Sequence, residues 1–135
     1  MNANLLVKAA RTGRTIARVT PESAGWRYVG FEAIWLAPGE RYTTKTGERE
    51  LCIVVISGHV SLTSGDLVFR ELGSRASPFE DAAPAAAYLP PGRDFSIRAQ
   101  TAAEVALCWA PAERWGRHSC AWPVVPPKRR ASVDA

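Results

Sequence analysis

The chain has 135 residues, a length that fits one domain with a single hydrophobic core. Hydrophobic residues make up 47% and charged residues 22%, the composition of an ordinary globular protein. No run approaches the roughly 18 apolar residues that a membrane-spanning helix needs, so no membrane partner is expected. The N-terminal stretch has only Leu5, Leu6 and Val7 before the charges begin, which argues against a secretory signal.

The formal charge of +4 is concentrated at the C-terminal end. From Ala112 onward, five basic and two acidic residues supply +3 of that charge. The basic cluster at residues 128–130 has no interleaved aromatic residues, so it indicates a solvated terminus and not a nucleic-acid partner. Several prolines accompany it, and the sequence therefore predicts a domain over residues 1–111 and a disordered Pro/Arg-rich tail over residues 112–135.

Three cysteines, Cys52, Cys108 and Cys120, lack the CxxC spacing of redox motifs and of many metal sites. An odd number leaves one thiol without a partner in any disulfide scheme. Cys52 and Cys108 lie inside apolar runs, where a free thiol behaves as a small hydrophobic side chain. Structural thiols in the reducing cytoplasm are therefore expected.

The remainder reads as short strands separated by glycine and proline turns. Residues 2–8 predict a short edge strand, and residues 11–18 are basic and turn-like. Residues 20–25 contain a proline and a glycine, which predict a structured loop in place of a regular element.

A strand is predicted over residues 26–37, where alternate residues share one apolar face. That face comprises Val29, Phe31, Ala33, Trp35 and Ala37. Glu32 lies on the other face, between Gly30 and Ile34. Two interpretations of this carboxylate stay open: it lies on the solvated rim of a barrel, or in a polar interior.

Residues 50–62, ELCIVVISGHVSL, predict the centre of the fold. The run 51–56 is apolar on both faces and indicates a strand that is buried on both sides. After Gly58, the alternating residues 59–62 predict the returning arm of a β-hairpin. His59 is interpreted either as a rim or packing histidine, or as a group that titrates near neutral pH in the barrel mouth.

Further strands are predicted at residues 40–45, 67–69, 95–99 and 104–110, with residues 70–84 as a loop. No segment has the periodicity of an amphipathic helix. The pattern predicts an all-β single domain, either a barrel or a sandwich.

The order of turns and strands resembles a cupin, a double-stranded β-helix of the jelly-roll type. Metal-binding cupins hold a divalent ion with imidazoles and a carboxylate from neighbouring strands. When the two cupin motifs are placed on this chain from Gly39, their histidine positions fall on Lys45, Gly47 and Phe95. No metal is therefore expected in this chain.

Three longer stretches resemble the 5-deoxy-glucuronate isomerase family of myo-inositol catabolism. They are TPESAGWRYVGFEAIWL (20–36), TGERELCIVVISGHVSL (46–62) and LGSRASPFEDAAPAAAYLPPG (72–92). The resemblance covers residues 4–112 and implies a bicupin that converts 5-deoxy-glucuronate to 5-dehydro-2-deoxy-gluconate. It also implies that only the N-terminal cupin is present, and that the divalent metal belongs to a second cupin that this chain lacks.

The segments that resemble the family place site candidates at residues 20–26, 46–50 and 75–80. Glu50 or Glu32 is predicted as a catalytic base, and Arg49, Arg75, Glu80 and His59 are predicted as substrate contacts. A guanidinium binds a carboxylate bidentately, so Arg49 or Arg75 is predicted to hold the substrate's acid group. The alternative is that the charged residues of segments 49–50 and 75–80 form structural ion pairs between loops and strands.

Three functions stay open. The first is an isomerase whose catalysis depends on a missing or separate metal-bearing half. The second is a metal-free cupin that binds a sugar acid, or that associates as a homo-oligomer or with a separate second cupin. The third is an inactive fragment with an exposed apolar face, since the change in composition after Pro111 is typical of a truncated or frameshifted reading frame.

Overall fold

The computed structural model describes residues 8–25 and 28–112. Most of the predicted edge strand at residues 2–8 and nearly all of the predicted tail lie outside these ranges. Within them the chain forms, in order, β1 (Thr15–Val19), α1 (Pro21–Ala24), β2 (Gly30–Leu36), β3 (Arg41–Lys45), β4 (Arg49–Ser57), β5 (Val60–Ser64), β6 (Leu67–Leu72), β7 (Ala85–Leu89), β8 (Asp94–Ala99) and β9 (Ala103–Pro111). No helix of this described part is long and apolar enough to cross a membrane.

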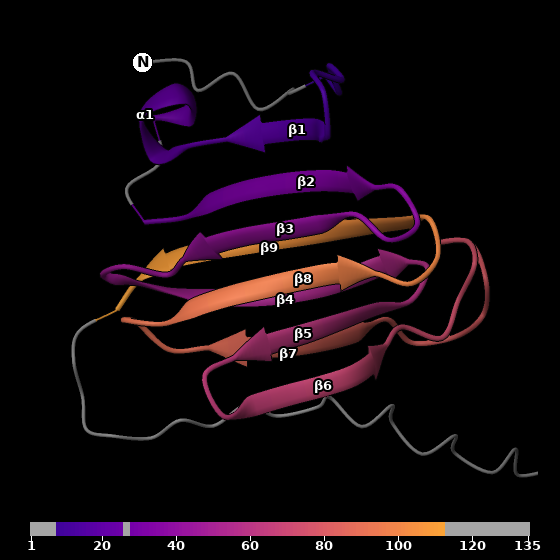
Figure 1. Cartoon of the computed structure of the whole chain (residues 1–135). Helices are drawn as coiled ribbons and strands as arrows, with labels where there is room; N and C mark the ends of the chain where they lie inside the picture. Colours follow the sequence, from indigo (N-terminus) through magenta and orange to yellow (C-terminus); the bar gives the residue numbers. More distant parts are fainter. Residues whose placement is uncertain (1–7, 26–27, 113–135) are drawn as a thin grey trace, which may run out of the picture.

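The strands form two antiparallel sheets that face each other as layers (Figure 1). One sheet has the order β1-β2-β9-β4-β7, and the other has the order β3-β8-β5-β6. The all-β prediction is confirmed. The five-stranded sheet extends past its partner, so that β1 and β2 lie beyond β3, the edge of the four-stranded sheet (Figure 1).

The core lies between the two layers and follows the period-two alternation of the strands. Leu51, Ile53 and Val55 of β4 are at most 1% exposed, and they pack in one cluster with Leu62 and Ile97 of the facing sheet. Burying such aliphatic side chains contributes roughly 1.5–3 kcal/mol each, which makes this cluster the main source of stability.

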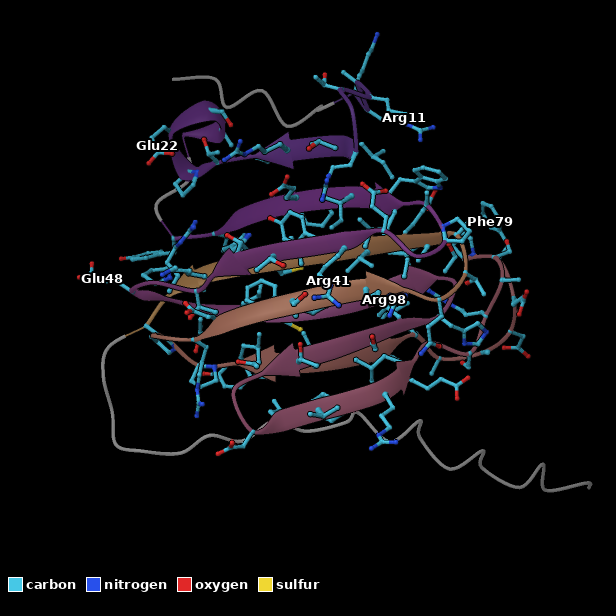
Figure 2. The ribbon with its side chains drawn as sticks, viewed as in Figure 1. Arg11, Glu22, Arg41, Glu48, Phe79 and Arg98 are labelled. Carbon is cyan, nitrogen blue, oxygen red and sulfur yellow. The ribbon has the colours of Figure 1, made fainter. Side chains whose placement is uncertain are left out.

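The two sheets have different outer faces. On the four-stranded sheet, Arg41 and Arg98 are cross-strand partners that point away from the core (Figure 2). On the five-stranded sheet, Cys52 is exposed and Val54 and Ile56 are half-buried. The prediction that the run 51–56 is buried on both sides is therefore wrong, because only the odd-numbered residues of that run face the core.

The predicted hairpin at residues 50–62 is also wrong. β4 pairs with β7 and β9, whereas β5 pairs with β6 and β8, so the chain crosses from one sheet to the other at Gly58. Alternation predicts strands but not which sheet they join. Gly58 has φ 85°, and a Cβ added there would meet the backbone of Ala102 and Ala103, so only glycine fits this crossing.

Three smaller expectations are corrected as well. Part of the basic, turn-like segment 11–18 is the edge strand β1. The predicted loop at residues 20–25 contains the single-turn helix α1, whose N-cap Thr20 and Ser23 exchange side-chain and backbone hydrogen bonds of 2.9 and 3.1 Å. Strand β6 continues to Leu72, into the predicted loop.

The crossing at Gly58 gives the first testable prediction. A Cβ at this position would lie 2.8 Å from the Ala103 Cα, in a left-handed backbone conformation. We expect Gly58→Ala to lower the free energy of unfolding by about 2–4 kcal/mol, measured by urea denaturation.

Gly92→Ala is the matched control. Gly92 also has a left-handed conformation, with φ 76°, but no atom lies within 4 Å of its added Cβ. Its cost should stay near 1 kcal/mol, the conformational term alone. Equal losses for the two variants would contradict the role of close packing at the crossing.

Candidate functional site

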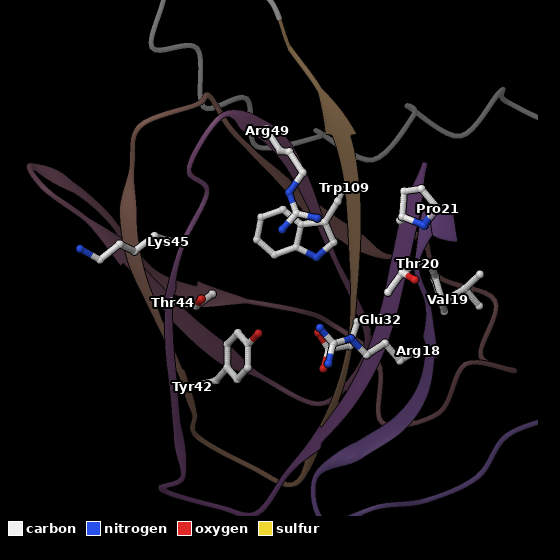
Figure 3. A pocket seen from close by; sticks show the side chains of 12 residues that line it. Arg18, Val19, Thr20, Pro21, Glu32, Tyr42, Thr44, Lys45, Arg49 and Trp109 are labelled. Atoms are coloured by element: carbon white, nitrogen blue, oxygen red, sulfur yellow. The ribbon is translucent and has the colours of Figure 1, made fainter. Parts of the chain in front are cut away.

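A pocket of about 130 Å³ opens between β3 and the overhanging strands β1 and β2. Its lining comes from β1, β2, β3, β4 and β9 and from the N-terminal end of α1; Figure 3 shows the side chains around it. The lining residues are Arg18, Val19, Thr20, Pro21, Gly30, Phe31, Glu32, Tyr42, Thr44, Lys45, Arg49 and Trp109. A space of this size holds several waters or a small polar molecule.

Glu32 supplies the carboxylate of the pocket. It lies on the inner face of β2, half-buried, and its Oε1 accepts a hydrogen bond of 3.2 Å from the Thr15 hydroxyl. Its cross-strand partner on β1 is Arg18, which lines the same pocket (Figure 3). Of the two interpretations of Glu32, the structure agrees with the rim: the half-buried carboxylate lines a pocket at the open edge of the barrel.

Arg49 supplies a second cation at the start of β4. Its guanidinium lies 4.4 Å from the ring centroid of Trp109, a cation–π contact that holds the side chain over the pocket floor (Figure 3). Within the described residues, neither Arg18 nor Arg49 makes a side-chain ion pair or hydrogen bond. Both guanidinium groups therefore keep their donors for a ligand.

Tyr42 faces these groups from β3. Burial and the negative charge of Glu32 raise the pKa of its phenol, although Arg18, Arg14 and Arg49 act in the opposite direction. The phenol therefore remains a hydrogen-bond donor at neutral pH. The carboxylate of Glu32 and the three guanidinium groups therefore lie close enough to Tyr42 to affect its pKa.

Arg14 ties the outer wall of the pocket to β3. Its guanidinium lies 3.2 Å from the Glu40 carboxylate and donates a 3.1 Å hydrogen bond to the Arg41 carbonyl. It also lies 5.9 Å from the ring centroid of Tyr42. These contacts fix the position of Tyr42 relative to β1 and the width of the pocket.

The pocket does not fit a resident divalent ion. It offers one carboxylate and no imidazole, and the described residues contain no group of three or more His, Cys, Asp or Glu side chains that could hold a metal. Phe95, at a cupin histidine position, is 2% exposed and packs between the rings of Tyr42 and Trp109, with centroids 6.4 and 6.3 Å apart. The expected absence of a metal stays a prediction.

The other two histidine positions lie at the end of β3 and in the turn that follows it. The Lys45 side chain is 78% exposed and lies 3.6 Å from the Asp94 carboxylate, and Gly47 is in a turn. The inward-facing residues of β3 are Tyr42 and Thr44 (Figure 3). Neither position therefore directs a side chain into the barrel interior.

Two of the six predicted site residues, Glu32 and Arg49, line the pocket together. Glu50 follows Arg49 and therefore points to the outer face of the five-stranded sheet, where it accepts a 2.9 Å hydrogen bond from the Tyr88 hydroxyl. The structure does not bring Glu50 to the pocket.

Arg75, Glu80 and His59 lie at the far end of β4, since Gly58 donates a hydrogen bond to the Arg75 carbonyl. Nine residues of strand separate the two ends by roughly 25–30 Å. The Glu80 carboxylate accepts from the backbone amides of residues 76 and 77, and the His59 Nδ1 lies 3.7 Å from the Glu71 carboxylate. Within the described residues Arg75 and Glu80 bond to backbone groups and not to each other, so this end has structural contacts but not the predicted ion pairs.

Sequence reasoning missed Arg18, Tyr42 and Trp109 as lining residues. Trp109 shares the inner face of β9 with Val105 and Leu107, and Tyr42 is the aromatic residue in an otherwise polar strand. The period-two pattern of these two strands could therefore have identified Trp109 and Tyr42 as inward-facing residues. Arg18 had no such signal, because its segment reads as a basic turn.

The fold and its jelly-roll layers define the class of the protein. Its structure is similar to the cupin domain of Schizosaccharomyces pombe Cnp3, with a TM-score of 0.53 over 71% of this chain and 12% identity. It is also similar to oxalate decarboxylase, with a TM-score of 0.57 over 70% of this chain and 20% identity. These likenesses confirm the predicted cupin fold.

The particular family follows from the sequence. The model of the KduI/IolB family matches residues 5–127, and the chain belongs to that family. It is 38% identical over 96 residues to the 5-deoxy-glucuronate isomerase of Geobacillus kaustophilus, covering 71% of this chain and 35% of the relative. The corresponding protein of Listeria innocua is 40% identical over 88 residues, 64% of this chain and 32% of the relative.

The fold also matches a solved structure of an IolB-like protein. An IolB-like protein from Salmonella typhimurium LT2 is 38% identical, with a TM-score of 0.78 over 82% of this chain and 42% of that chain. The chain thus spans about a third to two fifths of the length of the relatives it matches. The predicted resemblance to the 5-deoxy-glucuronate isomerases is confirmed.

The raised pKa of Tyr42 gives a prediction about alkaline pH. A phenol whose pKa is higher in the folded than in the unfolded state contributes stability that is present below the unfolded value of about 10 and is lost as pH rises through the folded value. We expect Tyr42→Phe to weaken the decline in unfolding free energy above about pH 10. Urea denaturation at a series of pH values measures this decline.

Tyr28→Phe is the control for this measurement, because the Tyr28 side chain is 57% exposed and lies outside the pocket lining. It should leave the alkaline decline unchanged. The same decline in wild type and in Tyr42→Phe would contradict the electrostatic description of the pocket.

Arg75 gives a prediction that separates structure from binding. Its guanidinium donates to three backbone carbonyls, those of Ile56 at 2.9 Å, Ala82 at 3.2 Å and Pro78 at 3.4 Å. We expect Arg75→Met to lower the free energy of unfolding by about 1.5–3 kcal/mol, measured by urea denaturation, because these are charge-assisted bonds. The exposed Arg70 serves as the control, and Arg70→Met should change stability by less than about 0.5 kcal/mol.

Ligand titration of the same variant completes the test. A stable Arg75→Met protein that loses affinity for 5-deoxy-glucuronate would support the original substrate-binding prediction for Arg75 over the structural one.

Proposed function

We propose that this chain binds a sugar acid of the 5-deoxy-glucuronate type in the pocket between β3 and β1–β2, and that it takes part in an aldose–ketose isomerisation. The observation that carries the proposal is that one cavity combines Glu32 and Tyr42 with two guanidinium groups that make no ion pair within the described residues. Family relatives named 5-deoxy-glucuronate isomerase support the substrate class. A cytoplasmic location is part of the proposal, on the argument from the free thiols.

The acid group of the ligand is assigned to Arg49. A guanidinium presents parallel N–H donors that match a carboxylate, and stacking on Trp109 holds this fork in place without using those donors. Preorganisation of this kind reduces the rotamer entropy lost on binding. Arg18 supplies a second positive charge on the opposite wall.

The proton transfer is assigned to Glu32. In an aldose–ketose isomerisation a C–H bond breaks at the hydroxyl-bearing carbon and another forms at the neighbouring aldehyde carbon. The hydroxyl proton passes to the former aldehyde oxygen, so the reaction is balanced without an external oxidant. Glu32 removes the carbon-bound proton and returns it to the neighbouring carbon, and the Tyr42 phenol hydrogen-bonds the oxygen on which charge develops.

A second function, a metal-free binding module, is favoured by one observation. The described lining of the pocket has one carboxylate and no imidazole, and so no metal-ligand set. In this case the sugar acid binds but does not turn over. The apolar outer face of β4, with Val54 and Ile56 half-buried, is the surface that a second copy or a separate cupin would cover.

Titration calorimetry with 5-deoxy-glucuronate tests the binding step. We expect Arg49→Met to weaken binding about 10–100-fold, which corresponds to one charge-assisted interaction. Arg98→Met removes the same charge from the outer face of the other sheet and is the matched control; its affinity should equal that of the wild type (Figure 2).

An isomerisation assay of the same proteins, with and without added Zn²⁺ or Mn²⁺, tests the chemistry. Glu32→Gln should keep the ligand affinity and lose turnover about 10²–10⁴-fold. Binding without turnover by the wild type would establish the binding module, and the absence of binding would overturn both assignments. Aggregation of the purified chain would instead favour the inactive fragment.

A further inference from the structure

Two thiols are brought together on the outer face of the five-stranded sheet. Cys52 of β4 and Cys108 of β9 are direct cross-strand partners in the antiparallel ladder, and both are free cysteines. Cys52 is exposed to solvent, and Cys108 is half-buried. Residues directly opposite each other place their side chains on the same face of a sheet, so the two thiols are neighbours.

The ladder geometry is compatible with a disulfide. Opposed residues in antiparallel strands have Cα atoms about 4.5–5.5 Å apart, and disulfides join Cα atoms about 4.4–6.8 Å apart. Both strands lie inside the sheet, β4 between β9 and β7 and β9 between β2 and β4. Neighbours on both sides hold the register, so the two thiols stay opposed in the folded protein.

The groups around the pair come from four strands. Phe31 of β2 is opposite Cys108, and Tyr88 of β7 is opposite Cys52. Along their own strands the thiols are flanked by Glu50, Val54, Ala106 and Ala110. The titratable groups of this set, in the described residues, are Glu50 and Tyr88, which hydrogen-bond to each other at 2.9 Å.

We propose that Cys52 and Cys108 form a cross-strand dithiol site that reacts with small-molecule disulfides, such as oxidised glutathione, and becomes an intramolecular disulfide. The Cys52 thiolate attacks one sulfur of the small disulfide, and a glutathione thiolate leaves. The Cys108 thiolate then attacks the Cys52 sulfur of this mixed disulfide and releases the second glutathione. One disulfide is formed and one is reduced, so the electrons balance.

The order of attack follows from exposure, because Cys52 is the accessible thiol and Cys108 is covered on one side. Burial raises the pKa of both thiols, and the charge of Cys52 raises that of Cys108 further. Among the described neighbours of the pair, none is a basic side chain that would favour a thiolate. The reaction rate should therefore rise about tenfold per pH unit through the neutral and mildly alkaline range.

The experiment treats the full-length reduced protein with oxidised glutathione, followed by alkylation, intact mass and peptide mapping. The wild type should lose two hydrogens, retain no glutathione on Cys52, and yield a cross-linked peptide joining Cys52 and Cys108. Cys120→Ser is the matched control, because it removes the third cysteine and should form the same cross-link. Cys108→Ser should trap glutathione on Cys52, since the resolving thiol is absent.

Thermal unfolding gives a second readout that is independent of mass. The oxidised wild type should unfold at a higher temperature than the reduced protein, and dithiothreitol should reverse the shift. Stable glutathione on Cys52 of the wild type, or a cross-link to Cys120 in place of Cys108, would overturn the proposal. An unchanged unfolding temperature after formation of the Cys52–Cys108 bond would show that the ladder already holds these strands and would leave the site itself established.

Discussion

The pairing of β4 with β9 constrains both the barrel and the pocket. The ladder runs from Arg49, opposite Pro111, to Ser57, opposite Glu104, at the centre of the five-stranded sheet. Its inner face contributes aliphatic side chains to the core. The first residue of β4, Arg49, lies over Trp109 of β9. Such a cation–π contact contributes about 0.5–2 kcal/mol. Because Arg49 and Trp109 belong to the two paired strands, the same ladder positions the floor of the pocket and the core.

Much of the fold could be predicted from the sequence because alternation is a local property. The strands at residues 95–99 and 104–110 correspond to β8 and β9 within a residue or two. The pairing of strands is not local, which is why the run 50–62 suggested a hairpin although its two strands belong to different sheets. At this crossing Gly58 lies close to Ala103, a residue far away in the sequence, so the alternation within the segment could not predict the contact.

The site shows the same division. Glu32 could be placed on the face opposite the aromatic residues of its strand, but the neighbour that gives it a partner, Arg18, comes from a segment without strand periodicity. Glu50 and Arg49 differ by one position and lie on opposite faces of β4, so a motif alone could not choose between them. The proposed substrate class rests on the family relatives, whereas the choice of pocket residues rests on the sheet register.

The overhang of β1 has a consequence for the pocket as a binding site. Within the described residues β1 pairs with one strand, β2, and no strand of the facing sheet lies beneath it. Arg14 and its contacts to Glu40 and to the Arg41 carbonyl brace this outer wall against β3. The two sides of the cavity are therefore held by different interactions: its floor belongs to the hydrophobic core, whereas its outer wall depends on the polar contacts of one arginine.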